Sequence, residues 1–160
     1  MINGVASRTR TTLFGQGGPA VGEARARLEQ NIQHWNAHDS GAWVGDFSPA
    51  AQIVGPGASG SGIEMARTFY SIWQDAFPDN EVRVTDIFED GATAILQAEF
   101  WGTQTETMNA PEQTIPATGR RVNIPFVVIN QFDGGKITQF TLYFDRAELL
   151  GQLGLLPAPS

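Results

Sequence analysis

The order of the sequence patterns predicts an α+β domain, in which helices cover one face of an antiparallel sheet. Two long segments in the first half carry apolar residues at helical spacing. The period then changes to two, and four alternating segments precede a last short helix. With 160 residues and no internal repeat, the chain has the usual size of one domain.

The helical half comes first. Residues 1–19 are rich in Gly, Ser, Thr and Arg without any period, which predicts a flexible tail before a single domain over 20–160. Proline ends the second long helix, at Phe77-Pro78. The expected elements of this half are a helix over 21–38, a helical turn at 42–47, a strand at 50–55 and a helix over 63–76.

The second half is predicted to form the sheet. Strands are expected at 81–88, 92–101, 121–132 and 136–144, with 103–119 as a polar connection. The sequence Asp133-Gly134-Gly135-Lys136 favours a tight hairpin between the last two strands. Asp145 followed by Glu148 is typical of a capping box, so we interpret Asp145 as the cap of the closing helix rather than a catalytic acid.

Composition limits the partners that we expect. The net charge is −7 and the ten Lys and Arg residues are dispersed, which speaks against nucleic acid and against an anionic membrane surface. The chain has no cysteine, and no apolar run approaches the ~20 residues of a membrane span. His34 and His38 have metal-ligand spacing but no third ligand. We expect a cytoplasmic protein without metal or cofactor.

Four segments, in order and at matching spacing, resemble one family. They are WNAHD, GIEMARTFYSIWQDAFPD, PATGRRVNIPFVVINQFDGGKI and FDRAELLGQLGL, and the resemblance runs from about residue 24 to residue 156. Each is similar to a segment of the SnoaL-like polyketide cyclases. The resemblance implies the cone-shaped fold of the nuclear-transport-factor-2-like superfamily, in which a curved antiparallel sheet wraps around N-terminal helices and encloses a pocket.

The catalytic residues of that family do not carry over. The resemblance puts the family's general base, an Asp, at Leu142, its assisting His at Val128 and its pocket Asn at Gly55. Leucine, valine and glycine cannot take up or donate a proton through their side chains. The mechanism of the family is therefore not expected in this chain, although its fold is.

The pocket is expected to be apolar and aromatic. The resemblance implies that Val128 and Leu142 face inward. Strand alternation then places the amide of Asn130 on the same inner stripe as Val128, where it needs a hydrogen-bond partner such as a ligand carbonyl. The predicted lining residues are Trp35, Tyr70, Trp73, Phe100, Gln104, Phe126, Val128, Asn130, Phe140 and Leu142.

Two ionisable residues are candidates for acid–base work. Asp86 shares a stripe with Val82 and Phe88, and burial there would raise its pKa and suit a general base. The alternative is a solvated carboxylate near a strand end. His38 could line the pocket mouth, or be a solvated residue at the end of its helix.

Two functions follow from these patterns. The first is a cofactor-free enzyme of cyclase or isomerase type, acting on a hydrophobic polyketide-like or polycyclic small molecule. The second is a protein of the same fold that binds such a molecule without converting it. A homodimer is expected through the outer sheet face, where strand alternation places Val127, Ile129, Ile137 and Tyr143.

Overall fold

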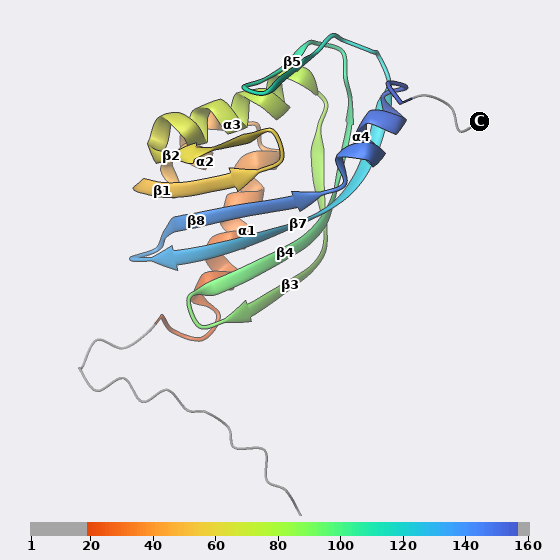
Figure 1. Cartoon of the computed structure of the whole chain (residues 1–160). Helices are drawn as coiled ribbons and strands as arrows, with labels where there is room; N and C mark the ends of the chain where they lie inside the picture. Colours follow the sequence, from red (N-terminus) through yellow and green to blue (C-terminus); the bar gives the residue numbers. More distant parts are fainter. Residues whose placement is uncertain (1–18, 157–160) are drawn as a thin grey trace, which may run out of the picture.

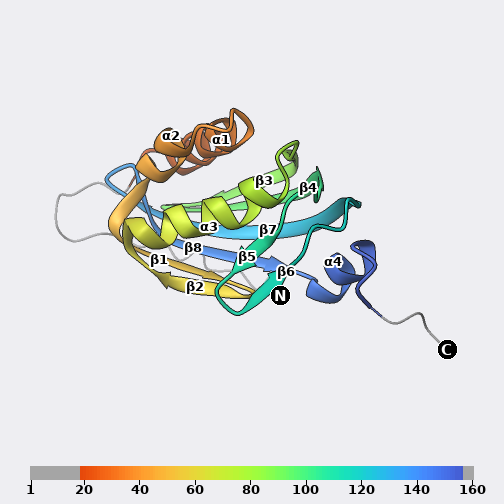
Figure 2. The same cartoon turned by 90° about the horizontal axis from the view of Figure 1, so that it is seen from above.

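The structure, a computed structural model, describes residues 19–156. A curved six-stranded sheet carries helices α1, α2 and α3 on one face, and α4 lies beyond one end of the sheet (Figures 1 and 2). The predicted tail lies almost wholly outside the described residues. In chain order the elements are α1 (Glu23–Asn36), α2 (Ser40–Gly45), β1 (Phe47–Gly55), β2 (Ala58–Ser61), α3 (Gly62–Ala76), β3 (Glu81–Asp90), β4 (Thr93–Thr103), β5 (Met108–Ala110), β6 (Gln113–Ile115), β7 (Arg121–Asp133), β8 (Lys136–Phe144) and α4 (Arg146–Gln152).

The helices form where their apolar residues recur at helical spacing. In α1 the buried face includes Leu28, Ile32 and Trp35, and the rest of the helix faces solvent. The side chain of Asp39 caps α2 by accepting a hydrogen bond from the Ala42 amide at 2.9 Å. None of the helices within 19–156 is long and apolar enough to cross a membrane.

The sheet is mixed, which corrects the expectation of a wholly antiparallel one. Its strand order is β2-β1-β8-β7-β4-β3, and every neighbouring pair is antiparallel except β1 and β8. Strands β1 and β8 lie far apart in the sequence, so no hairpin fixes them in opposite directions. The sheet does not close, because β2 and β3 form two separate edges.

Two short hairpin elements were missed by the sequence patterns. Strand β2 has the sequence ASGS, which offers no apolar alternation beyond Ala58. The predicted polar connection contains β5 and β6, which pair with each other and bury Met108 and Ile115. These strands have three residues each, too few to show a period.

Two β-bulges reverse the alternation of inner and outer residues and correct two predictions. The irregularity in β3 between Val84 and Asp86 leaves Asp86 exposed and turns Ile87 inward. The irregularity in the pairing of β7 with β8 after Gln131 puts one extra residue in β8, and Ile137 is fully buried. Asp86 is therefore not internal, and Ile137 is not on the outer face.

The start of α4 agrees with the capping prediction. Asp145 Oδ1 accepts hydrogen bonds from the amides of Ala147 at 2.9 Å and Glu148 at 3.2 Å. The buried apolar residues form one contiguous cluster between the helices and the concave face of the sheet. Aromatic rings dominate its centre: Trp43 lies 6.0 Å from Phe69 and 5.5 Å from Tyr70, centroid to centroid.

Candidate functional site: an apolar cavity with two amides

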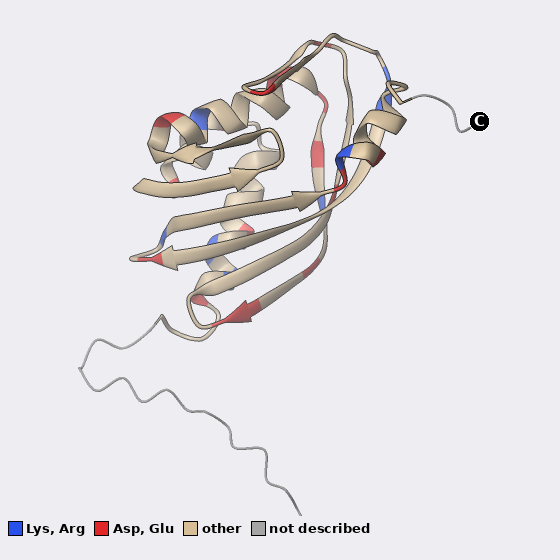
Figure 3. Cartoon of the chain, in the orientation of Figure 1, with Lys and Arg blue, Asp and Glu red and all other residues tan. Residues whose placement is uncertain are grey.

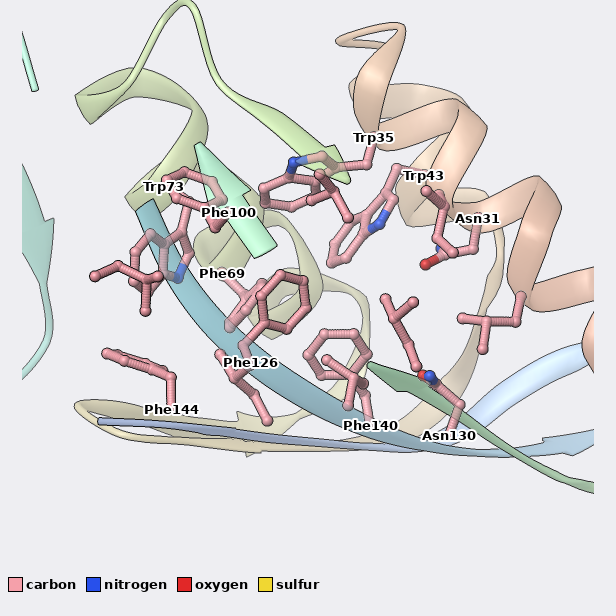
Figure 4. Close-up of a pocket in the computed structure, with 17 residues that line it drawn as sticks. Asn31, Trp35, Trp43, Phe69, Trp73, Phe100, Phe126, Asn130, Phe140 and Phe144 are labelled. Atoms are coloured by element: carbon pink, nitrogen blue, oxygen red, sulfur yellow. The ribbon is translucent and has the colours of Figure 1, made fainter. Parts of the chain in front are cut away.

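A cavity lies between α1, α2, α3 and the concave face of the sheet (Figure 4). Its volume is about 70 Å³, which holds a few water-sized molecules and is well below that of a usual ligand pocket. A polycyclic molecule therefore fits only if aromatic side chains move. The lining residues are Leu28, Asn31, Ile32, Trp35, Trp43, Phe69, Trp73, Val82, Leu96, Phe100, Ile124, Phe126, Val128, Asn130, Phe140, Leu142 and Phe144.

Most residues predicted to line the pocket surround this cavity. The strand residues reach it because alternate side chains of β7 and β8 point to the concave face, and the helical ones because they share the inner faces of α1 and α3. The predicted residues found there are Trp35, Trp73, Phe100, Phe126, Val128, Asn130, Phe140 and Leu142.

Tyr70 and Gln104 are buried but do not line the cavity. The ring of Tyr70 packs edge-on against Trp35, with 5.3 Å between the ring centroids. Burial, with the nearby carboxylates of Asp39 and Asp75, raises the pKa of Tyr70, so its phenol stays neutral.

Gln104 has a structural role instead. Its Nε2 donates to the carbonyl oxygen of Ile115 at 3.1 Å, and its Oε1 accepts from the Thr118 hydroxyl at 2.7 Å. These bonds tie the chain after β6 to the end of β4. The side chain of Gln104 is fully buried, and both its amide nitrogen and its amide oxygen form hydrogen bonds with protein atoms. It is therefore not positioned to bind a ligand.

The two candidate acid–base residues also lie outside the cavity. The carboxylate of Asp86 is exposed and accepts a hydrogen bond from the amide of Ile87 at 2.8 Å. His38 adopts a left-handed conformation just after α1, and its Nε2 lies 3.1 Å from the carbonyl oxygen of Asn80. Neither residue is among those that surround the cavity, so the predicted inward positions are wrong.

Asn31 was not singled out by the sequence patterns, yet it lines the cavity. Its Nδ2 donates to Asp46 Oδ2 at 2.9 Å, and the same oxygen lies 2.9 Å from His34 Nδ1. Asp46 follows α2 and comes close to α1 only in the folded chain. The helical spacing of Asn31 between Leu28 and Trp35 was the one signal that could have placed it on the inner face.

Asn130 is the second amide of the cavity. It is fully buried, and neither its Nδ2 nor its Oδ1 finds a hydrogen-bond partner among residues 19–156. An amide in this state costs stability, since its groups lose the hydrogen bonds that water gives them in the unfolded chain. The groups that can satisfy it are those that enter the cavity.

The positions assigned to the missing catalytic set lie together in space. Val128 and Leu142 are directly paired across β7 and β8. A Cβ added at Gly55 would lie 3.5 Å from the Leu142 Cβ. The three positions therefore form one contiguous region of the inner sheet face, and in this chain that region is apolar.

The cavity lining, as formed by residues 19–156, contains no carboxylate, imidazole, amine or guanidinium group. Proton transfer by a lining side chain at neutral pH is therefore not available. Within the described part of the chain, no group of three or more His, Asp or Glu side chains is placed to hold a metal ion.

Fold and cavity define a protein of the nuclear-transport-factor-2-like class: helices inside an open curved sheet, with an apolar cavity between them. The SnoaL-like domain model matches residues 28–140. The chain belongs to the SnoaL-like family. A comparison with curated protein sequences found no match.

Solved structures share the fold of this chain. A candidate SnoaL-like polyketide cyclase from Jannaschia has a TM-score of 0.75 at 21% identity, covering 89% of this chain and 100% of its own. AclR, a candidate hydroxylase from Streptomyces galilaeus, has a TM-score of 0.73 at 22% identity, covering 86% and 100%. TsrD from Streptomyces laurentii has a TM-score of 0.72 at 24% identity, covering 84% and 96%.

Proposed function

We propose that this protein binds an apolar small molecule in the cavity and does not convert it by side-chain acid–base chemistry. The observation that carries the proposal is the composition of the lining. Among the described residues that form it, two amides are the only polar side chains apart from the indoles of three tryptophans. Buried apolar and aromatic walls favour an apolar guest.

The supporting geometry is consistent. The family's catalytic positions are occupied by Gly55, Val128 and Leu142, and the two ionisable candidates, Asp86 and His38, lie outside the cavity. A protein that retains the fold and an apolar cavity retains what is needed to hold a ligand. Phe126 and Phe144 line the cavity and are only partly buried, so a turn of either ring would enlarge the cavity.

The binding proposal is tested with 4-fluorotoluene, followed by fluorine NMR line broadening. The test variant is Val128→Phe, which fills the cavity, and the matched control is Val127→Phe, on the next residue of the same strand but on the outer face. Binding by the parent and the control, and its loss in Val128→Phe, supports the proposal. Absence of binding to the parent, or equal loss in both variants, contradicts it.

A second candidate is the cyclase or isomerase type of reaction that the family suggests. The observation that favours it is the free Nδ2 donor of Asn130, because such a donor stabilises an enolate oxygen in a water-poor site. Hydrogen–deuterium exchange at the methyl group of acetophenone tests it. Exchange that is faster than in buffer, and that falls to the buffer rate in Asn130→Leu, indicates catalysis. Exchange at the buffer rate in the parent supports binding without catalysis.

We further propose a homodimer formed through the outer sheet face. One row of neighbouring residues crosses this face from β4 through β7 and β8 to β1, and consists of Ile95, Ile129, Thr141 and Val54. Tyr143, in the next row of β8, is 58% exposed. The charged residues of β7 and β8 lie at the ends of these strands, so the part of the face formed by these two strands is uncharged between its ends (Figure 3). A second copy of the chain would cover these apolar side chains.

A further inference from the structure

The polar groups of the cavity are gathered at one end. Figure 4 shows Asn31 and Asn130 on the same side of the cavity, whereas Trp73 and Phe144 lie at the opposite side. Asn31 comes from α1 and Asn130 from β7, so the two amides approach the cavity from the helical layer and from the sheet. An apolar ligand with one polar end fits this arrangement in one direction only.

The orientation of the Asn31 amide is fixed by its neighbours. A carboxylate only accepts hydrogen bonds, so the atom that faces Asp46 must be the Nδ2 donor. The same reasoning puts the proton of His34 on Nδ1, since that nitrogen also faces Asp46. The remaining Asn31 oxygen is directed toward the cavity in Figure 4, where it offers an acceptor.

Asn130 adds a donor and a second acceptor. Both of its side-chain atoms are unpartnered within the described residues, so neither is committed to the protein. The polar end of the cavity therefore presents the acceptor oxygen of Asn31, together with the donor and acceptor of Asn130. A carbonyl or an ether would leave the Asn31 oxygen unpaired, because neither group carries a hydrogen to donate.

We propose that the ligand is a neutral molecule whose polar end is a hydroxyl group, held between Asn31 and Asn130. The hydroxyl donates to Asn31 Oδ1 and accepts from Asn130 Nδ2, while the apolar remainder lies against the aromatic end. This inference rests on the proposed binding function. A carboxylate ligand is excluded by the same geometry, because no cationic side chain lines the cavity and Asn31 offers an anion only an oxygen.

The test compares two probes of nearly equal shape, 4-fluorophenol and 4-fluorotoluene, by fluorine NMR titration at pH 7. The phenol is neutral there, since phenols ionise near pH 10. The main variant is Asn130→Leu, which keeps the shape of the side chain and removes its hydrogen bonds. The matched control is Asn123→Leu, on the same strand, which also removes an unpartnered amide oxygen but does not line the cavity.

The measured quantity is the ratio of the two dissociation constants. In Asn130→Leu the preference for 4-fluorophenol is expected to fall by about tenfold, the value of a lost buried hydrogen bond, and to stay unchanged in the control. Asn31→Leu should shift the ratio in the same direction, which keeps the test decisive if Asn130→Leu does not fold.

Each other outcome overturns the inference in a distinguishable way. If both probes bind and the ratio is the same in parent, Asn130→Leu and Asn31→Leu, the hydroxyl assignment is wrong while binding in the cavity stands. If the control shifts the ratio as far as the cavity variants do, the preference does not come from the cavity amides. If neither probe binds the parent, the proposed function fails as well.

Discussion

Replacing Leu142 with Asp tests whether the region that corresponds to the family's catalytic set is truly dry and apolar. Leu142 is 8% exposed, is paired with Val128 and lies against Gly55, and no cation lines the cavity beside it. An introduced carboxyl would lack a charged partner. Because burial penalises the charged form, its pKa in the folded protein should rise above the unfolded value of about 3.9.

The expected loss has two parts. Losing the buried leucine side chain costs about 2 kcal/mol, and burying an imperfectly paired neutral acid costs about 2 kcal/mol more. A rise of about two pKa units adds ~2.7 kcal/mol once the group is ionised. The variant is thus close to unfolding at pH 7, given the ~5–15 kcal/mol stability of a typical domain.

The pH dependence has a definite sign. The folded variant binds its proton more tightly than the unfolded chain, so the charge penalty is absent below about pH 3.9 and grows as pH rises through the folded pKa. Leu142→Asn is the matched control, because its amide has the same shape and no charge. The assay is urea unfolding, followed by tryptophan fluorescence, of parent and both variants between pH 4 and 7.

The difference in unfolding free energy between Leu142→Asp and Leu142→Asn should widen from pH 4 to pH 7. A difference that stays constant over this range would refute the reasoning, because it would mean that the carboxyl ionises as it does in water. The apolar character of this region, and with it the argument against acid–base chemistry there, would then be lost.

Three further predictions concern the rest of the molecule. Asp145→Ala should lower the unfolding free energy by about 1 kcal/mol in urea titrations and leave 4-fluorotoluene binding intact, so full stability with lost binding would contradict the capping role. Burial raises the pKa of Asp79, but hydrogen bonds from Thr103 and the charge of Arg121 outweigh burial and lower this pKa below its ordinary value of 3.8. Asp79→Ala should therefore destabilise the protein at pH 7, and the destabilisation should vanish as pH falls through the lowered pKa. Light scattering should show a dimer for the parent and a monomer for Ile129→Asp, and a parent monomer at micromolar concentration would contradict the interface.

The sequence predicted the main elements because their periods are long enough to be unambiguous. The helix face that holds Leu28 and Trp35 and the alternation from Ile124 to Asn130 each cover several repeats. The resemblance to the family, rather than periodicity, indicated that Val128 and Leu142 face inward, and both residues line the cavity. Periodicity no longer predicts which residues face inward once a β-bulge interrupts the alternation of a strand. No residue pattern in the sequence marks the position of either bulge.

The bulges explain the principal errors in the site. The alternation of inner and outer residues, continued from Val82, predicted that Asp86 faces inward. One extra residue in β3 shifts the alternation, so Asp86 faces outward. The same kind of error put Ile137 on the outer face. Gln104 was misplaced for another reason, since its hydrogen-bond partners come from a hairpin too short to predict.

The pairing of Asn31 with Asp46 could not be predicted, because it depends on how α1 and the end of α2 meet in space. The helical spacing indicates that Asn31 is on the inner face of α1. It does not indicate that the Asp46 carboxylate binds the Asn31 nitrogen and so leaves the Asn31 oxygen facing the cavity. Hydrogen-bond partners that are 15 residues apart and on different elements require the tertiary structure.

The contrast between the two kinds of polar residue favours binding over side-chain acid–base chemistry. Among residues 19–156, every ionisable side chain is outside the cavity lining, and the positions that the resemblance assigns to the family's catalytic set are apolar. Asn130, however, stays polar at a fully buried site where leucine would remove a cost of about 1–3 kcal/mol. Proteins tolerate such local costs mainly at functional sites. An amide cannot supply or remove a proton at neutral pH, but it can recognise a neutral polar group, and that is the chemistry that the cavity keeps.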